Sequence, residues 1–359
     1  MPRKDPMHPE EITLEWITYA LKESGYLKQS SIKSIEKNIL GEGKGLLSSV
    51  VRVDIEYDDQ EENTPSSVVV KIEPEEGDFV DFNNEFSSFQ REIKFYKEIA
   101  SNVPIRLPKF YYAVDEPPAY SLVLEDLSHY SPGDQVVGMH EEQVMATVEQ
   151  LARLQSVYWN NEALSELSWM PRMNGVSSDF AENWPSFVEN YGFYLDDRGI
   201  KLGEKLSGFI EWKNTEIEKR PHTIVHADLR EDNIMFGPPR SEDSIIILDW
   251  QLTIRSVGAA DVARLMGGSE IPKERKGHQF EILKRWYDTL IEQGVTGYTW
   301  DDAVYDFRLG ALSYLCYPVH FHKSGISAEG RLKELVEVIY RRSFSSAVDI
   351  DAGSILPGY

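Results

Sequence analysis

Residues 224–251 read IVHADLREDNIMFGPPRSEDSIIILDWQ, and the rest of the chain is interpreted from this stretch. It holds His226 and Asp228, then Asn233 five residues after the aspartate, then Asp249 after the apolar run IIIL. The apolar segments TIV and IIIL predict short buried strands, which place the polar residues in the loops that follow them. The H-x-D-x-x-x-x-N spacing is that of a kinase catalytic loop.

These polar residues have the chemistry that phosphoryl transfer requires. A loop carboxylate such as Asp228 can accept a hydrogen bond from an attacking hydroxyl and act as the catalytic base. Asn233 and Asp249 offer oxygen ligands, which suit Mg2+, and we expect His226 to brace the loop. A single H-x-D is common, and loop Asp and Asn often make turns. The prediction of a phosphoryl-transfer site therefore rests on the H-x-D-x-x-x-x-N spacing together with the apolar strand that ends at Asp249.

Two charged residues upstream fit the same site. Lys71 interrupts the β-branched run VVVKIE, and a strand lysine that faces a cleft can bind the α- and β-phosphates of ATP. An ordinary edge-strand lysine is the alternative interpretation. Glu92 lies on a helix predicted over residues 85–100 and is the expected partner of Lys71, although Glu85 and Glu98 lie on the same helix.

Two backbone segments are candidates for nucleotide contacts. Gly41, Gly43 and Gly45 lie between two predicted strands, and closely spaced glycines let backbone N–H groups approach phosphates. The pattern is equally typical of a flexible turn, and it is not the G-x-x-x-x-G-K-[ST] of P-loop ATPases. The strand end LVLEDL, which contains Glu125 and Leu127, could present backbone atoms to an adenine edge, with a plain strand end as the alternative.

The order of predicted elements divides the chain into two lobes of an α+β protein. Residues 1–127 predict a strand-rich lobe with a cover helix and one internal helix, and residues 128–359 predict a larger, mostly helical lobe. The strands expected in the first lobe are 31–40, 50–57, 67–73 and two more around the Pro-Pro turn within 106–127. The expected helices are 10–23, 85–100, 141–159, 257–267, 274–293, 300–322 and 328–347.

Bulk composition excludes several classes of protein. The net charge of −23 argues against DNA or RNA as a partner and fits a cationic substrate or simply a solvated surface. Cys316 is the one cysteine, which excludes an intrachain disulfide and a cysteine-based metal site. The sequence has no signal-peptide pattern and no apolar stretch long enough to span a membrane, so we expect a cytoplasmic location.

With these parts in place, the chain resembles the aminoglycoside phosphotransferase and choline kinase superfamily. It is most similar to the ecdysteroid-kinase-like branch and related bacterial phosphotransferases, over residues 12–344. The segments that carry the resemblance are GEGKGLLSSVVRV, VVVKIE, REIKFY, LVLEDL, VHADLREDNIMF and LDWQ. The resemblance implies a bilobal protein-kinase-like fold, with ATP and Mg2+ as cofactors and a small-molecule, hydroxyl-bearing substrate.

The resemblance also implies a role for Asp261 as a structural residue that braces the catalytic loop. Ala227 stands where this branch more commonly has Gly, and we expect little consequence. Asp-Trp-Gln at 249–251 replaces the Asp-Phe-Gly of protein kinases, a difference that fits small-molecule kinases.

The acceptor stays open among amino alcohols, aminoglycosides, sugars and sterols, as does the oligomeric state. Candidate lining residues, most of which we expect in the core, are Trp184, Tyr191, Trp250, Tyr314, Tyr317, His320 and His322. A non-catalytic nucleotide-binding pseudokinase is the alternative function. A protein kinase is less favoured, because the interval between Asp249 and Asp261 leaves no room for an activation loop.

Overall fold

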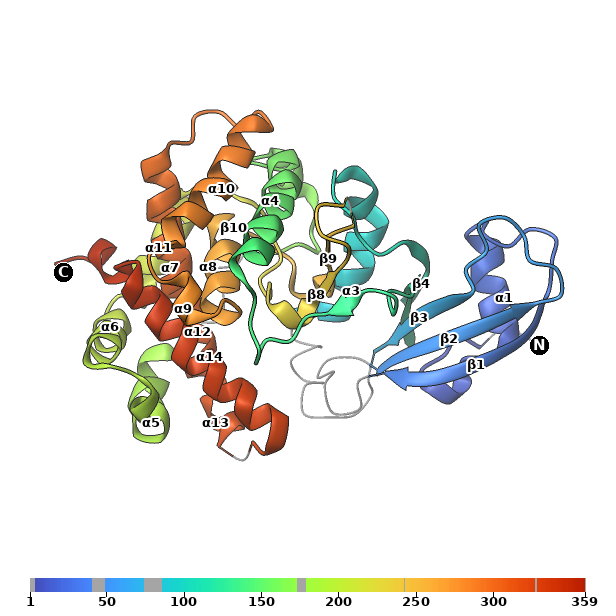
Figure 1. Ribbon diagram of the computed structural model, residues 1–359, viewed down its shortest axis with the longest axis horizontal. Helices are drawn as coiled ribbons and strands as arrows, with labels where there is room; N and C mark the ends of the chain where they lie inside the picture. The colour runs from blue at the N-terminus through green and yellow to red at the C-terminus, as the bar shows by residue number, and fades with distance from the viewer. Residues whose placement is uncertain are drawn as a thin grey trace. The chain divides into compact units, whose positions relative to one another are not determined.

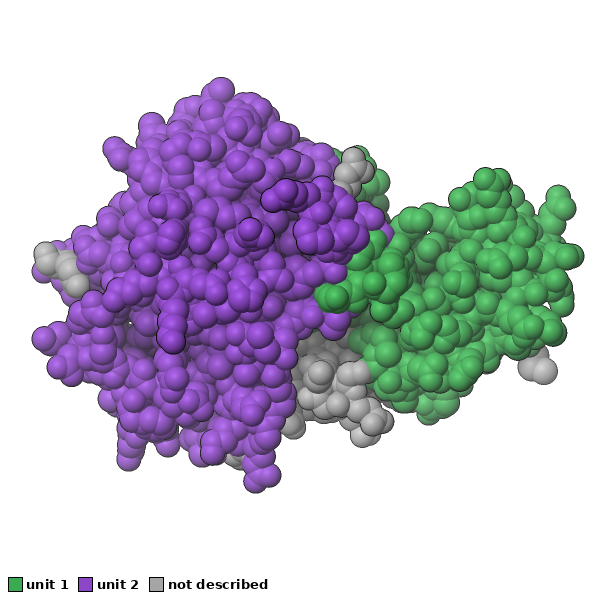
Figure 2. Space-filling view, in the orientation of Figure 1, with its two compact units in different colours: residues 1–102, 107–131, 248–252 green, residues 103–106, 132–247, 253–359 purple. Residues whose placement is uncertain are grey.

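The computed structural model of the chain describes residues 4–40, 49–73, 86–172, 179–241, 243–326 and 328–358 (Figure 1). The predicted phosphate loop with Gly41, Gly43 and Gly45 lies outside these residues, as does Glu85. Two compact units are coloured separately in Figure 2. The first comprises residues 1–102, 107–131 and 248–252, and the second comprises residues 103–106, 132–247 and 253–359.

The first unit is built on a five-stranded antiparallel sheet with the strand order β1-β2-β3-β5-β4. The strands are β1 (Ile32–Leu40), β2 (Ser49–Tyr57), β3 (Ser67–Ile72), β4 (Phe110–Glu116) and β5 (Ala119–Glu125). The register of β2 on β3 pairs Val50 with Lys71 and Val53 with Val68. The antiparallel hairpin expected from the sequence is therefore present.

Alternation along β3 gives the sheet two different faces. Val68, Val70 and Ile72 are buried in one core with the apolar side of α1 (Leu14–Glu23), whereas Lys71 points to the opposite face. Helix α1 begins at Leu14 rather than at residue 10, because the Thr13 hydroxyl accepts the Trp16 N–H at 3.1 Å and caps the helix. Residues 9–11 form a separate turn, η1 (Pro9–Glu11).

The other face of the sheet carries the internal helix α3 (Ser88–Lys94), which continues as a π-helical turn η2 (Phe95–Ile99) and a turn η3 (Ala100–Asn102). The short helix η7 (Trp250–Leu252) packs against α3. The rings of Phe95 and Trp250 stack with centroids 4.1 Å apart and planes 5° apart. A segment from late in the chain thus completes the core of the first unit.

The second unit is mostly helical, with a two-stranded and a three-stranded sheet among its described residues. In the first, β7 (Thr223–Val225) pairs with β10 (Ile254–Ser256). In the second, β8 (Ile234–Phe236) lies between β9 (Ile245–Ile247) and β6 (Ser131–Pro132), where the chain enters the unit. The helices between β6 and β7 are α4 (Glu141–Val157), η4 (Glu162–Glu166), α5 (Phe180–Tyr191), η5 (Gly192–Tyr194), α6 (Asp197–Ser207) and α7 (Ile210–Lys219). The turn η6 (Glu231–Asn233) lies between β7 and β8. The helices after β10 are α8 (Ala259–Gly268), α9 (Pro272–Arg275), α10 (Gln279–Glu292), α11 (Trp300–Tyr314), α12 (Cys316–His320), α13 (His322–Gly325), α14 (Gly330–Asp349) and η8 (Ala352–Ile355).

Helix α8 lies at the centre of this unit and is buried over nearly its whole length. It packs against α11 and α14. The approach to α11 is close at Gly310, where an added Cβ would lie 2.6 Å from the Cα of Ala260. None of the helices in the described part of the chain is long and apolar enough to cross a lipid bilayer.

Two predicted helices are interrupted in the structure. The helix expected over 300–322 ends at Tyr314, because Pro318 has no N–H to donate to the Tyr314 carbonyl. The helix expected over 274–293 begins at Gln279, because Gly277 adopts a left-handed φ of 95° and separates α9 from α10.

Candidate functional site

Lys71 of β3 lies between two carboxylates within the first unit. Its Nζ is 2.5 Å from Glu92 Oε2 on α3 and 2.8 Å from Asp249 Oδ1. The Glu92 side chain is 1% exposed and that of Lys71 10%. Burial alone would lower the pKa of the Lys71 ammonium, but Asp249 and Glu92 raise it above its usual range. The structure therefore brings together three residues that the sequence analysis assigned to one site, with the lysine fully charged.

Asp249 follows β9 in a left-handed backbone conformation, with φ of 64°. Aspartate tolerates this conformation better than most residues, at a cost of roughly 1 kcal/mol or more. Its Oδ2 accepts a hydrogen bond from Gln251 Nε2 at 3.1 Å, and 24% of the side chain is exposed. A partly exposed carboxylate in a strained turn fits the predicted metal ligand, and the strain itself was not foreseen from the sequence.

The predicted catalytic loop of the second unit presents Asp228 between two arginines. Arg264 Nη2 on α8 is 2.5 Å from Asp228 Oδ1, and Arg230 Nε is 3.1 Å from Asp228 Oδ2. Burial would raise the pKa of Asp228, but the two guanidinium groups outweigh it and lower the pKa to about 2. The predicted catalytic carboxylate is thus ionised and doubly ion-paired. Neither arginine was predicted from the sequence, although Arg230 stands two residues from Asp228.

Asp261 holds the backbone of this loop, as the resemblance implied. Its carboxylate, 0% exposed as part of α8, accepts the N–H groups of His226 at 2.8 Å and Ala227 at 3.0 Å. His226 Nδ1 in turn accepts the Asp228 N–H at 3.2 Å. Ala227 has a left-handed φ of 66°, which glycine adopts more easily. The change from Gly is therefore not without consequence, since it strains the loop by roughly 1 kcal/mol.

Asn233 ends η6 with its amide nitrogen turned toward the catalytic loop. Nδ2 donates to the Asp228 carbonyl at 2.9 Å and to Asp228 Oδ2 at 3.3 Å. The amide oxygen is the atom that this orientation leaves for a metal ion. An amide oxygen and a carboxylate are the hard donors that Mg2+ prefers, so Asn233 and Asp249 fit that ion by their chemistry. Asn233 belongs to the second unit and Asp249 to the first.

The predicted adenine-binding segment closes β5 in the first unit. The Glu125 N–H donates to the Lys109 carbonyl at 2.9 Å, and the Leu127 carbonyl accepts the Tyr130 N–H at 2.9 Å. Asp126 between them accepts Arg52 Nε and Ser67 Oγ, both at 2.7 Å. The Glu125 N–H and the Leu127 carbonyl are therefore already hydrogen-bonded within the chain. A backbone contact with adenine stays a prediction.

The aromatic candidates for an acceptor pocket divide into two groups. Trp184, Tyr191 and His322 are buried, and their rings contact Phe187 in a cluster between α5 and the C-terminal helices, while Trp250 is buried against Phe95. These four are core residues, as expected for most of the set. His320 Nδ1 pairs with Asp179 Oδ2 at 2.8 Å.

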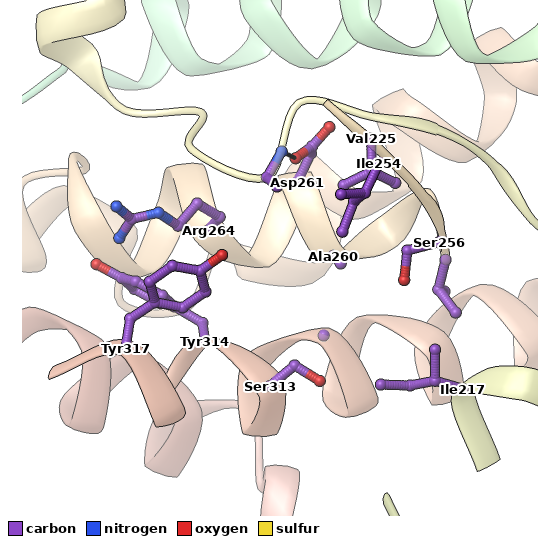
Figure 3. Close-up of a pocket in the computed structure, with 13 residues that line it drawn as sticks. Ile217, Val225, Ile254, Ser256, Ala260, Asp261, Arg264, Ser313, Tyr314 and Tyr317 are labelled. Atoms are coloured by element: carbon purple, nitrogen blue, oxygen red, sulfur yellow. Dashed lines mark hydrogen bonds between the residues drawn. The ribbon is translucent and has the colours of Figure 1, made fainter. Parts of the chain in front are cut away.

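Tyr314 and Tyr317 instead line a cavity of about 50 Å³ beside the catalytic loop (Figure 3). Arg264 lies over both rings, with Cζ 4.2 Å from the Tyr314 centroid and 5.5 Å from that of Tyr317. Ala227 and Asp261 form part of the same wall, so this cavity adjoins the loop that carries Asp228.

Comparison with known proteins agrees with this geometry. A model of the ecdysteroid kinase-like family matches residues 42–190. The predicted resemblance is confirmed. A second model, described as "Uncharacterized oxidoreductase dhs-27", matches residues 219–320. That range of the kinase-like chain contains the catalytic loop and has no G-x-G-x-x-G turn of the dinucleotide-binding kind. A search of curated proteins finds no match.

Solved structures extend the similarity over nearly the whole kinase-like chain. A protein from Ralstonia eutropha, provisionally described as an aminoglycoside phosphotransferase, has a TM-score of 0.53 at 12% identity and covers 93% of this chain and 98% of its own. The GDP and kanamycin complex of APH(2″)-IIIa has a TM-score of 0.52 at 14% identity, over 92% of this chain and 98% of its own. At these identities the comparison establishes the fold, which is protein-kinase-like.

Proposed function

We propose that this chain is an ATP-dependent kinase that transfers the γ-phosphate to a hydroxyl of a small molecule. The observation that carries the proposal is the contact of Lys71 with both Glu92 and Asp249. A strand lysine held by a helix glutamate beside a metal-binding aspartate is the arrangement that kinases use for the phosphates of ATP. The similarity to phosphotransferases, one of them crystallised with GDP and kanamycin, supports the same function.

In this proposal the chain's residues divide the work between binding and orientation. Lys71 binds the α- and β-phosphates, and Glu92 holds its ammonium in place. Asn233, through Oδ1, and Asp249 hold Mg2+, which when bound neutralises charge on the phosphates.

The backbone of three glycines and of the strand end completes the nucleotide site. Gly41, Gly43 and Gly45 cover the phosphates, and the backbone at Glu125 and Leu127 contacts the adenine.

Asp228 acts on the acceptor. The acceptor oxygen forms a bond to the γ-phosphorus, the bond from that phosphorus to the oxygen bridging the β-phosphate breaks, and ADP leaves. Asp228 accepts the hydrogen bond of the attacking hydroxyl and takes its proton as the new bond forms. Its pKa of about 2 makes it a weak base. Its main contribution is therefore to orient the hydroxyl, which suits a loose phosphoryl-transfer transition state.

The proposal is tested by nucleotide binding and ADP release together. Calorimetry with ATP or GTP should show binding that depends on Mg2+ and is lost in Asp249→Asn. A coupled ADP-release assay should then be run on a panel of amino alcohols, aminoglycosides, sugars and sterols. Asp228→Asn should keep nucleotide binding and lose turnover, whereas Asp232→Asn on the same loop should keep most of it.

The outcomes separate the candidate functions. Mg2+-dependent nucleotide binding without acceptor-dependent ADP release would favour the pseudokinase alternative. Absence of Mg2+-dependent nucleotide binding in the unchanged protein would refute the kinase proposal altogether.

A further inference from the structure

Arg264 lies beside the proposed catalytic carboxylate and has an excess of hydrogen-bond donors. Its Nη2 contacts Asp228 Oδ1 at 2.5 Å. Its Nε and Nη1 are buried and have no hydrogen-bond partner among the residues that the structure describes. Only 10% of the side chain is exposed. A buried guanidinium with unpaired N–H groups is costly, and such a group in a native protein usually serves a ligand, an ion or water.

Arg230, the other arginine on Asp228, differs in this respect. Besides Asp228, its Nη1 contacts Asp232 Oδ2 at 2.7 Å and Gln135 Oε1 at 3.3 Å. Arg230 therefore already has a second carboxylate, whereas Arg264 shares the carboxylate of Asp228 with it. Of the two, Arg264 is the arginine with capacity for a further anion.

The cavity beside Arg264 has one acidic residue among its described lining, Asp261, whose carboxylate already accepts the N–H groups of His226 and Ala227. Among the described residues that line the cavity in Figure 3, Arg264 alone is basic. The rings of Tyr314 and Tyr317 hold its guanidinium in place and exclude water from one side. Ser313 and Tyr317 in its wall are half-buried. A planar carboxylate fits a guanidinium edge by paired hydrogen bonds.

We propose that the acceptor of this kinase is a hydroxy acid, whose hydroxyl donates to Asp228 while its carboxylate binds Arg264. The inference rests on the function proposed above. Arg264 Nη2 and Asp228 Oδ1 are 2.5 Å apart. A small molecule that contacts both residues therefore carries its hydroxyl and its carboxylate on the same carbon, on adjacent carbons or on carbons separated by one other. The carboxylate would accept hydrogen bonds from Nε and Nη1, the two Arg264 donors that have no partner among the described residues.

This acceptor differs from the cationic one that the net charge of −23 suggests. Net charge is distributed over a solvated surface and is screened within about 8–10 Å. An acceptor group in contact with Asp228 is recognised by the neighbouring side chains, and there a cationic amine would meet two guanidinium groups. The local contacts therefore outweigh the overall charge.

The test uses triads of acceptors that differ in one group. The carboxylate, neutral and ammonium members are glycerate, glycerol and 3-amino-1,2-propanediol; gluconate, sorbitol and glucamine; and mandelate, phenylethanediol and 2-amino-1-phenylethanol. Binding is measured by calorimetry on the full chain with Mg2+ and a non-hydrolysable ATP analogue, and turnover by ADP release with ATP. In at least one triad the carboxylate member should bind about tenfold or more tightly than both others, the value of a charge-assisted hydrogen bond.

Arg264→Gln should reduce that ratio to less than about threefold, and Arg264→Lys, which keeps the charge but not the planar fork, should retain part of it. Arg230→Gln is the matched control, since it removes the other guanidinium from Asp228 and should leave the ratio unchanged while turnover changes. Circular dichroism and nucleotide binding establish that each variant is folded. If Arg264→Gln does not fold, the ratios of the unchanged protein and of Arg264→Lys decide.

The inference is overturned if no carboxylate member binds, or if in every triad the carboxylate member binds no more tightly than the neutral and ammonium members. It is also overturned if the preference for the carboxylate member survives Arg264→Gln. ADP release with neutral or ammonium members alone would overturn the hydroxy acid and leave the kinase proposal standing. Loss of Mg2+-dependent nucleotide binding in the unchanged protein would instead refute the kinase proposal.

Discussion

Lys71→Met should destabilise the first unit far more than Glu92→Gln, because the two residues have different numbers of partners. Lys71 contacts Glu92 and Asp249, so it keeps a carboxylate when Glu92 is changed. Glu92 is 1% exposed, and one of its oxygens has no hydrogen-bond partner. Among the described residues, the partner that Glu92 keeps without Lys71 is the backbone of Trp250, through one hydrogen bond.

The magnitudes follow from this asymmetry. Removing one partner of a buried ion pair costs about 3–5 kcal/mol, which is the expectation for Lys71→Met. Glu92→Gln loses one charge-assisted hydrogen bond and leaves the lysine paired, so about 1–2 kcal/mol is expected. The double variant Lys71→Met/Glu92→Gln leaves no buried charge at position 92, and Asp249, which is 24% exposed, loses its lysine in it as it does in Lys71→Met. The double variant should therefore be more stable than the sum of the single changes by about 2 kcal/mol.

The penalty should also depend on pH. In Lys71→Met the buried Glu92 carboxyl has a pKa above its unfolded value of about 4.3, so the folded state binds the extra proton. Stability of this variant therefore rises as pH falls from 8 toward 5, and the double variant should lack that dependence. Urea unfolding followed by circular dichroism at both pH values measures it. Equal costs for the two single changes, with no difference between pH 5 and pH 8, would refute the reasoning.

Three further changes test other features. Gly310→Ala should cost roughly 1–3 kcal/mol in urea unfolding, because its Cβ would lie 2.6 Å from the Ala260 Cα; unchanged or raised stability would contradict the close helix contact. Glu270 is 0% exposed, neither of its oxygens has a hydrogen-bond partner in the described part of the chain, and burial raises its pKa to about 8. Its folded state therefore keeps a proton that the unfolded chain loses above pH 4–5, and stability falls as pH rises to 8. Glu270→Gln should remove this loss and be more stable than the unchanged protein by about 2 kcal/mol or more at pH 8, with little difference at pH 5; a constant difference would argue against a neutral Glu270. Thr13→Ala should lose the cap on Trp16 and cost about 1 kcal/mol, whereas Thr13→Ser should not, as thermal unfolding would show.

Local patterns were enough to predict most of the first unit. Alternation along VVVKIE places Lys71 on the face opposite the core, and helical spacing places Glu92 near it. The choice of Glu92 over Glu98 could not come from spacing alone, since it depends on how α3 is rotated against the sheet. In the structure Glu98 instead lies 3.8 Å from Lys94 on the surface.

The features that were missed depend on contacts between distant segments. Arg264 follows Asp261 by one helical turn and so shares its face of α8, yet nothing local indicates that it reaches Asp228, 36 residues away. Trp250 was a candidate for the acceptor pocket and is buried against Phe95. The sequence alone does not tell whether an aromatic residue after the predicted metal-binding aspartate packs into a core or lines a pocket.

The return of residues 248–252 to the first unit has a consequence for biosynthesis. The ion pair between Lys71 and Asp249 joins residues 178 positions apart. While the chain emerges from the ribosome, the five strands of the sheet are complete long before Asp249 has been translated. During that interval Lys71 has Glu92 as its carboxylate partner, and Phe95 has no Trp250 ring to cover it. Contacts this far apart form late, because the long loop between them must first be closed. The nascent first unit is therefore a sheet without the Lys71–Asp249 ion pair and the Phe95–Trp250 stack, and a fragment that stops at residue 131 would remain in that state.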